Sequence, residues 1–186
     1  MAKRKNIIMS WSENTVEVGE TGANDAMATA LFSVGTINDK STSLTTTDGD
    51  TLTAKASGGI TVAEEESEPT LELTTRVKEM DFDTEHLFTG AEENEDGELV
   101  VKSNKVEKEF SLKVTPKNIG AKGLKARRCH VKFRPGSSEE EGSYVDLTFK
   151  ILPCEDDELY RYFRVKQTDK DNIKLASDII AATGNG

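Results

Sequence analysis

Hydrophobic and polar residues alternate with a period of two over much of the chain. In residues 71–77, Leu71, Leu73 and Val77 alternate with threonine and charged side chains. Because successive side chains of a strand point to opposite faces, this alternation predicts a strand with one buried face. The same pattern recurs at 110–114, 129–133, 145–151 and 159–165. Several such strands predict a mainly β fold, an antiparallel sandwich or barrel with one face in water.

Glycine-containing segments separate these runs and predict turns. They are TDGD at 47–50, SGG at 57–59, EDGE at 95–98 and RPGSS at 134–138. The acidic residues 91–98 predict a solvated loop between two elements. Residues 115–128 (TPKNIGAKGLKARR) are basic and contain glycine, so they predict an extended, mobile loop.

Two segments have helical features. Residues 80–90 (MDFDTEHLFTG) offer an Asp or Thr cap, an apolar stripe and Gly90 as a stop, which predicts a short helix. The stripe consists of Phe82, Leu87 and Phe88. Residues 171–184 (DNIKLASDIIAATG) fit either a second short helix capped by Gly184 or an arm strand.

Charge and hydropathy exclude some classes of protein. The chain of 186 residues has 34 acids against 24 bases and a net charge of −10, which disfavours a nucleic-acid binder that clamps phosphates. No segment approaches the roughly 18 apolar residues that span a bilayer. The first residues, MAKRKNIIMSW, contain only three apolar residues between the basic start and Ser10, so we expect no signal peptide and no membrane partner.

No pattern of catalytic or metal-binding residues is present. Cys129 and Cys154 form no CxxC pair; two buried thiols are expected, with a structural disulfide as the alternative. His86 and His130 have no nucleophile or carboxylate at a recognisable spacing. The acidic runs at 64–68 and 138–142 lack the ligand spacing of a calcium loop. The sequence therefore predicts a protein without enzymatic activity, cofactor or metal.

Read in order, the chain resembles the phage tail-tube (major tail) proteins of long-tailed phages, over roughly residues 30–166. The first half of the resemblance consists of LFSVGTINDKSTSLTTTDGDTLTAKASGG, the acidic EEESEP, TLELTTRVKEM, FDTEHLFTG, LVVKSN and EKEFSLKVTP. The second half consists of ARRCHVKFRP, SYVDLTFKILPCED and LYRYFRVK, which resemble the closing hairpins of the family. More distant relatives of this family are the tube proteins of contractile tails and of the type VI secretion machine.

The resemblance implies a β-sandwich or barrel with one flanking short α-helix, an extended loop and terminal arms. It divides the chain into an N-terminal arm (1–28), a tail-tube-like β-sandwich domain (29–168) and a C-terminal arm or short helix (169–186). Six copies are expected to form a ring, and rings to stack through loops and arms into a tube. Other implied partners are tape-measure, tail-tip and terminator proteins, with DNA passing through without tight binding. The implied location is the virion tail, assembled in the cytoplasm of the host bacterium.

Charge adds a hypothesis about contacts between subunits. The basic residues of the predicted loop are expected to meet acidic residues of a neighbouring subunit or ring, where charges set orientation more than affinity. The candidate residues are Lys117, Lys122, Lys125, Arg127, Arg128, Glu64, Glu65 and Glu66. For any single lysine, ordinary solvation remains the alternative. Threonine-rich residues 35–62 suit a water-facing tube lumen, since threonine fills a pleated surface without adding apolar area.

Two other functions remain open. One is a monomeric or oligomeric β-sandwich binding or decoration module of a virion, which favours exposed tryptophan or tyrosine on one sheet face. The chain offers only Trp11 near its start and the pair Tyr160 and Tyr162 for this role. The other is a small hydrolase, for which the sequence shows no site.

Overall fold

The computed structural model describes residues 11, 13–102 and 108–183. The predictions for the basic start of the N-terminal arm (1–10) and for Gly184 as a helix cap lie outside the described residues. The strands are β1 (Thr15–Glu20), β2 (Phe32–Ser33), β3 (Thr36–Ile37), β4 (Ser43–Thr47), β5 (Thr51–Lys55), β6 (Thr61–Glu66), β7 (Thr70–Lys78), β8 (Glu92–Glu93), β9 (Leu99–Val100), β10 (Glu109–Thr115), β11 (Lys122–Ser138), β12 (Gly142–Ile151) and β13 (Arg161–Arg164). The helices are the 3₁₀ turn η1 (Ala23–Asp25), α1 (Phe82–Thr89), α2 (Thr168–Asp171) and α3 (Ala176–Thr183).

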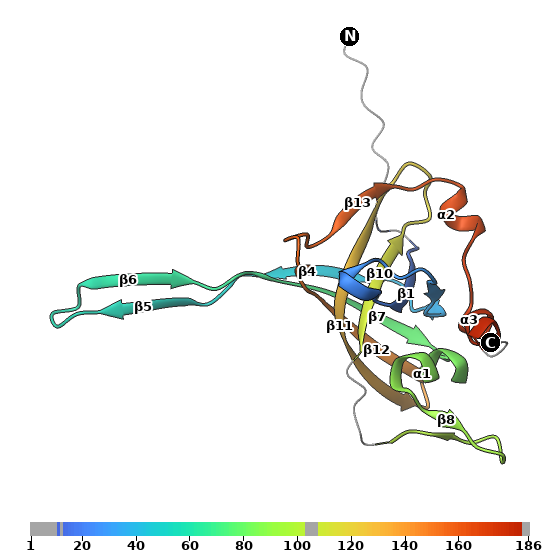
Figure 1. Cartoon of the computed structure of the whole chain (residues 1–186). Helices are drawn as coiled ribbons and strands as arrows, with labels where there is room; N and C mark the ends of the chain where they lie inside the picture. The colour runs from blue at the N-terminus through green and yellow to red at the C-terminus, as the bar shows by residue number, and fades with distance from the viewer. Residues whose placement is uncertain (1–10, 12, 103–107, 184–186) are drawn as a thin grey trace, which may run out of the picture.

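One curled antiparallel sheet forms the body of the molecule (Figure 1). Its strand order is β2-β1-β10-β11-β12-β7-β3, with β13 beside β11 and β4 beside β7. Strands β2 and β3 lie at opposite ends of this order, yet only Val34 and Gly35 separate them in sequence. The chain thus passes directly from one end of the order to the other, and the sheet curls into a half-barrel. The predicted mainly β, antiparallel fold is confirmed.

The core lies inside the curl of the sheet. Along β7, Leu71, Leu73 and Val77 are buried, and β12 alternates in the same way. This confirms the prediction from the period of two. The buried apolar side chains of β1, β10 and β11 complete the core: Val16, Val18, Phe110, Leu112, Val114, Leu124, Ala126 and Cys129.

Strand β10 departs from the predicted alternation, because both of its faces are buried. The hydroxyl of Ser111 accepts a hydrogen bond from the Ala28 backbone N–H and donates one to the Arg127 carbonyl. The ammonium of Lys113 lies 3.1 Å from Glu17 and 3.5 Å from Asp169. Segments distant in sequence thus cover the polar face that the pattern assigns to water.

Strand β1 comes from the segment that sequence alone assigns to an N-terminal arm. It pairs with β10 over its whole length and with β2 on its other side. Val16 and Val18 are fully buried. Residues 15–20 are therefore part of the sheet and not of an arm, because two strands supply their backbone partners.

Helix α1 confirms the predicted short helix. The Asp81 carboxylate caps it by accepting the Thr84 backbone N–H, and Gly90 ends it in the left-handed conformation at φ +69°. On the inward side, the Phe88 ring lies 5.9, 5.3 and 5.9 Å from the rings of Phe32, Phe110 and Phe133. This aromatic cluster fastens α1 to the body.

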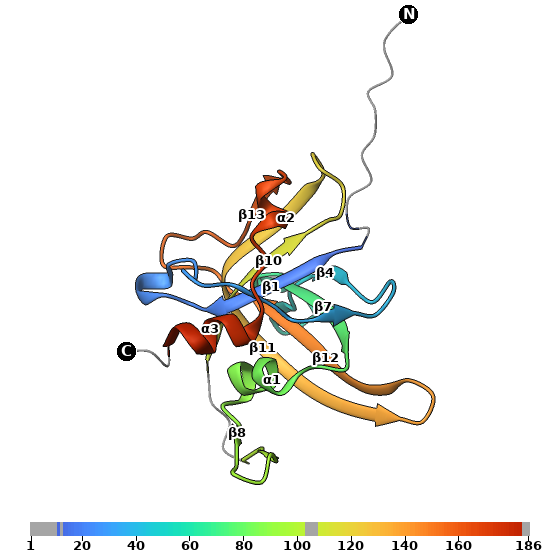
Figure 2. The ribbon, with the colours of Figure 1, turned by 90° about the vertical axis from the view of Figure 1, so that its right-hand side faces the viewer.

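The C-terminal segment forms a helix and not a strand, which settles the two alternatives left by the sequence. Helices α3 and α1 lie side by side (Figures 1 and 2). Ala176 at the start of α3 is buried in the core. Just before α3, the Lys174 carbonyl accepts the backbone N–H of Ser33 in β2.

Two of the four predicted turns are confirmed. SGG at 57–59 closes the β5–β6 hairpin, with Gly58 and Gly59 at φ +92° and +81°. EDGE at 95–98 joins β8 to β9, with Gly97 at φ +78°, so part of the predicted acidic loop is a small hairpin.

The other two predicted turns lie within extended chain. TDGD at 47–50 continues from β4 into β5, and its glycine serves a close crossing: a Cβ on Gly49 would lie 1.6 Å from the Ser67 carbonyl oxygen. RPGSS at 134–138 belongs to β11, and the turn follows at 139–141. Here a Cβ on Gly136 would lie 2.6 Å from the Tyr144 ring. In both places glycine makes room for a neighbour and does not reverse the chain.

The predicted mobile loop at 115–128 is also wrong. A short connection covers 116–121, and Lys122 begins β11, which here pairs with β10 on one side and β13 on the other. Leu124 and Ala126 are buried. The apolar residues of this stretch alternate with period two, but its lysines and glycines suggested a loop.

Candidate assembly surfaces

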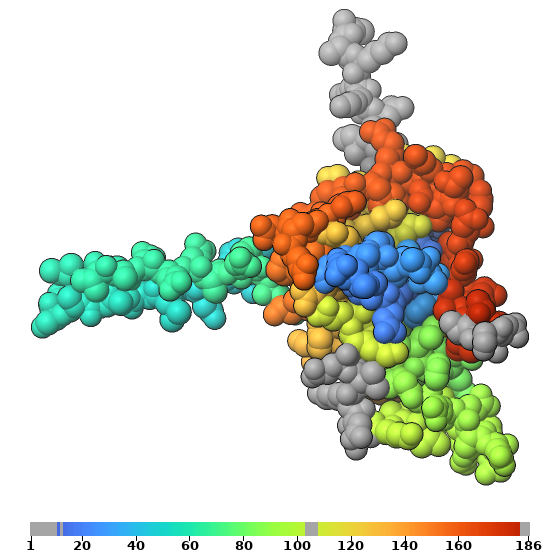
Figure 3. Space-filling view, viewed as in Figure 1, coloured from blue at the N-terminus to red at the C-terminus, as the bar shows by residue number. Residues whose placement is uncertain are grey.

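One hairpin stands clear of the rest of the molecule (Figures 1 and 3). We call residues 48–69, which contain β5 and β6, the arm. Every residue from 50 to 69 is exposed. Strands β5 and β6 pair with each other in a two-stranded sheet separate from that of the body. The body therefore leaves both faces and both outer edges of the arm uncovered.

The two faces of the arm differ in chemistry. Residues paired directly across two antiparallel strands share a face. The apolar face carries Leu52, Ala54, Ala63 and Glu65. The opposite face carries Thr51, Thr53, Glu64 and Glu66. Val62 has no partner in the ladder because the register shifts there. One face of the arm is therefore more apolar than the other.

Three large apolar side chains of the arm face solvent in the single chain. Leu52 is 69% exposed, Ile60 68% and Val62 64%. Burying one such side chain contributes about 1.5–3 kcal/mol. An isolated two-stranded hairpin is only marginally stable in water. The arm thus has the composition of a segment that another surface covers.

The acidic and basic residues predicted to meet lie on different parts of the molecule. Glu64, Glu65 and Glu66 are on the arm, which projects away from the body that holds the basic residues (Figure 1). The structure does not bring the two sets together in one chain. A contact between them belongs to a pair of chains.

The three lysines of the predicted set lie at or near the surface of the body. Lys117 makes an ion pair with Glu13, with its Nζ 2.6 Å from a carboxylate oxygen. Lys122 lies over the ring of Tyr162 at 4.1 Å, and Lys125 lies over the ring of Phe163 at 4.8 Å. The tyrosine pair considered for a binding module packs in part on itself, since the Tyr160 and Tyr162 rings are 5.2 Å apart.

The two arginines of the set have carboxylate partners within the chain. Arg127 is ion-paired with Asp156 and lies 3.5 Å from Glu158. Arg128 donates two hydrogen bonds to Glu109, at 2.6 and 2.9 Å. These bonds raise the pKa of Arg128 above its ordinary value, the hydrogen bond to Glu109 being the main cause. Both guanidinium groups are thus paired within the subunit itself.

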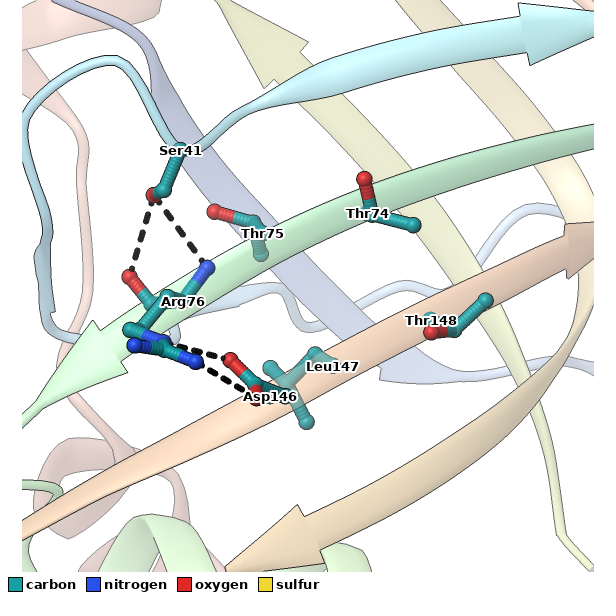
Figure 4. A pocket seen from close by; sticks show the side chains of 7 residues that line it. All are labelled: Ser41, Thr74, Thr75, Arg76, Asp146, Leu147 and Thr148. Carbon is teal, nitrogen blue, oxygen red and sulfur yellow. Dashed lines mark hydrogen bonds and ion pairs between the residues drawn. The ribbon is translucent and has the colours of Figure 1, made fainter. Parts of the chain in front are cut away.

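The outward face of β7 and β12 carries short polar side chains around an arginine (Figure 4). Thr74 and Thr148 pair across the two strands on this face. Arg76 donates to both carboxylate oxygens of Asp146, at 2.7 and 2.9 Å, and to Glu141 at 2.8 Å. A shallow hollow of about 280 Å³ lies between these side chains. The face is polar, and its arginine is neutralised.

The ion pair between Arg76 and Asp146 makes the stability of the subunit depend on pH, because Asp146 can be protonated. The hydrogen bonds from Arg76 hold the pKa of Asp146 below the ordinary value. The stabilisation is therefore present above about pH 3.9, the ordinary aspartate pKa, and is lost as the pH falls below it. Asp146→Asn removes this stabilisation, which is small because the ion pair is partly exposed to water. Urea unfolding at neutral and acid pH checks it: the difference between wild type and variant shrinks at acid pH, and an unchanged difference contradicts the assignment.

A groove runs beneath α1 along the second half of β11. We call it the α1 groove; its volume is about 820 Å³. Apolar side chains from three elements line it: Phe88, Phe110, Val131 and Phe133. Its charged lining is basic, with Lys102, Lys108, Lys132 and Arg134 against the single acid Glu85. Burial raises the pKa of Glu85 above its ordinary value. This groove could not be predicted from the sequence, because its residues come from separate segments.

The residues considered for chemistry have structural surroundings. Among the described residues, no group of three or more His, Cys, Asp or Glu side chains is placed to hold a metal ion. Cys129 and Cys154 are buried free thiols, and burial raises the pKa of both. His86 contacts the Ala91 carbonyl at the end of α1, and His130 is exposed on β11. Within the described ranges, no helix has the length and apolarity to cross a membrane.

Comparison with known proteins gives structural likenesses but no match in sequence. No family model matches the chain, and no curated protein matches it. One solved structure that it resembles is titled "Tail of empty GTA particle computed with helical refinement, C6 symmetry". The match has a TM-score of 0.39 and 10% sequence identity, and covers 82% of this chain and 95% of that chain. At this level, the likeness carries no conclusion about function.

Proposed function

We propose that this chain is the structural subunit of a phage tail tube, which polymerises as stacked hexameric rings into a conduit for DNA ejection. The arm is the observation that carries the proposal. It is a formed hairpin, exposed from residue 50 to residue 69, with three large apolar side chains in solvent. A subunit that works alone gains nothing from such an element, whereas a subunit that assembles covers it in every copy.

The curled sheet suits the wall of a tube. Its outward face on β7 and β12 presents threonines and an arginine held by two carboxylates, so it offers water a polar surface without adding apolar area. We assign this face to the lumen in place of the threonine-rich residues 35–62, because part of that segment lies in the arm, which projects from the body. The chain's net charge of −10 keeps DNA from adhering as it passes. In this proposal, residues 29–168 and strand β1 form the domain that builds the tube wall. Residues 169–186 form the C-terminal arm or short helix.

The proposed role is structural and not enzymatic. The partners it implies are further copies of the chain, together with the tape-measure, tail-tip and terminator proteins of a tail. The place of action is the virion tail, after assembly in the host bacterial cytoplasm.

We expect the mass of the particles to rise with protein concentration. Mass measurement by light scattering or native mass spectrometry, from micromolar to millimolar concentration, should show particles of six subunits and of multiples of six. The physical reason is that each added copy buries the exposed apolar surface of an arm.

A strictly monomeric chain at every concentration, also in the presence of tail-tip proteins, contradicts the proposal. That result favours the alternative of a monomeric binding or decoration module. A dimer or trimer without larger species argues against a tube and for a decoration module of lower order.

A further inference from the structure

The α1 groove and the arm have opposite charge. Residues 48–68 of the arm contain six acids and one lysine. The groove has four basic side chains in its lining against one acid, and one of the four, Lys108, already lies 3.2 Å from Glu20. Among the rest, Lys132 is exposed on β11. On a chain with net charge −10, a basic groove of this kind is selective for an acidic partner.

The apolar surfaces of the arm and the groove also match. The arm presents Leu52 and Val62 to solvent, and the groove is lined by the aromatic rings of Phe88 and Phe133 together with Val131. Basic side chains flank this apolar lining. A strand with an apolar face and glutamates beside it therefore finds both kinds of contact in one place.

From these observations we propose that the arm of one copy docks in the α1 groove of a second copy. Leu52 enters the apolar part of the groove, and the glutamates beside it, Glu64–Glu66, lie against Lys132 and Lys102. This inference rests on the proposed function, because it names the receiving surface for the arm. It differs from the hypothesis drawn from sequence, in which the basic residues at 117–128 receive the glutamates.

Charge reversal in the groove tests this docking. The variant Lys102→Glu with Lys132→Glu places acids opposite the acidic arm, and we expect the concentration needed for assembly to rise at least about tenfold. Adding Glu64→Lys and Glu65→Lys to the same chain restores the attraction and should recover assembly. The matched control is Lys122→Glu with Lys125→Glu, which leaves the groove unchanged and should assemble as the wild type does.

The outcomes separate the docking site from the proposed function. A wild-type chain that never assembles contradicts the proposed function, and this inference falls with it. A wild-type chain that assembles, with a groove variant that assembles at the same concentration, overturns the docking site alone. Loss of assembly in the Lys122 and Lys125 control but not in the groove variant places the glutamates at the basic segment instead. Recovery by the arm reversal excludes misfolding as the cause of loss.

Discussion

Replacing Leu52 with aspartate abolishes assembly at concentrations where the wild type assembles, and leaves the folded subunit intact. Leu52 is 69% exposed and lies on the apolar face of the arm. Burial of its side chain contributes about 1.5–3 kcal/mol in each copy, which corresponds to at least about a tenfold change in the affinity between copies. Aspartate removes this contribution and adds a charge that is costly to bury. Sedimentation velocity with circular dichroism measures both parts of the prediction.

The matched control is Leu52→Met, which keeps an apolar side chain of similar volume and should assemble as the wild type does. Since Leu52 faces water in the single chain, we expect the aspartate variant to change the free energy of unfolding by less than about 0.5 kcal/mol. Assembly of Leu52→Asp at the wild-type concentration removes the apolar face of the arm from any interface. A large loss of stability means that the arm packs on its own subunit.

Replacing Phe88 with alanine should lower the free energy of unfolding by about 3–5 kcal/mol. The Phe88 ring is buried and contacts the rings of Phe32, Phe110 and Phe133, so its removal leaves a cavity between α1 and the sheet. Phe82 begins the same helix but is 49% exposed, and Phe82→Ala is the control. Urea unfolding of the two variants checks the difference between them.

An equal and small effect of the two substitutions shows that α1 is not fastened to the body by its aromatic contact. Assembly is a second readout for Phe88→Ala, because Phe88 also lines the α1 groove. If α1 stays folded but loosely attached, assembly should weaken beyond what the loss of stability explains.

The strands of the body could be predicted where one face meets the core and the other meets water. Leu71, Leu73 and Val77 on β7 follow that rule, and so does β12. Strand β10 does not, because Glu17 and Asp169, from distant segments, lie against its Lys113. The alternation of apolar and polar residues identifies a strand that lies between the core and water. It does not show that distant segments cover the polar face of the strand.

Helix α1 could be predicted almost to the residue, since its cap Asp81 and its stop Gly90 are both local signals. Glycine was less informative in the arm. Gly49 is flanked by two aspartates, as a glycine in a turn often is. The sequence therefore predicts a turn at 47–50, where the chain instead runs on from β4 into β5. In the structure Gly49 allows the backbone to pass close to Ser67.

The candidate surfaces could be predicted only in part. The exposure of Glu64–Glu66 is as expected for an acidic run. Arg127 was a candidate for a contact between chains, but Asp156 and Glu158, nearly thirty residues later in sequence, pair with it in the folded subunit. The α1 groove joins residues near 88, 110 and 133, and only the tertiary structure places them together.

Electron microscopy of the concentrated, purified chain tests the central claim most directly. The account predicts hollow tubes built of stacked rings, each with sixfold symmetry, and with density for the arm of every subunit against a neighbouring copy. Separate globular particles at all concentrations, with or without tail-tip proteins to start assembly, would contradict it.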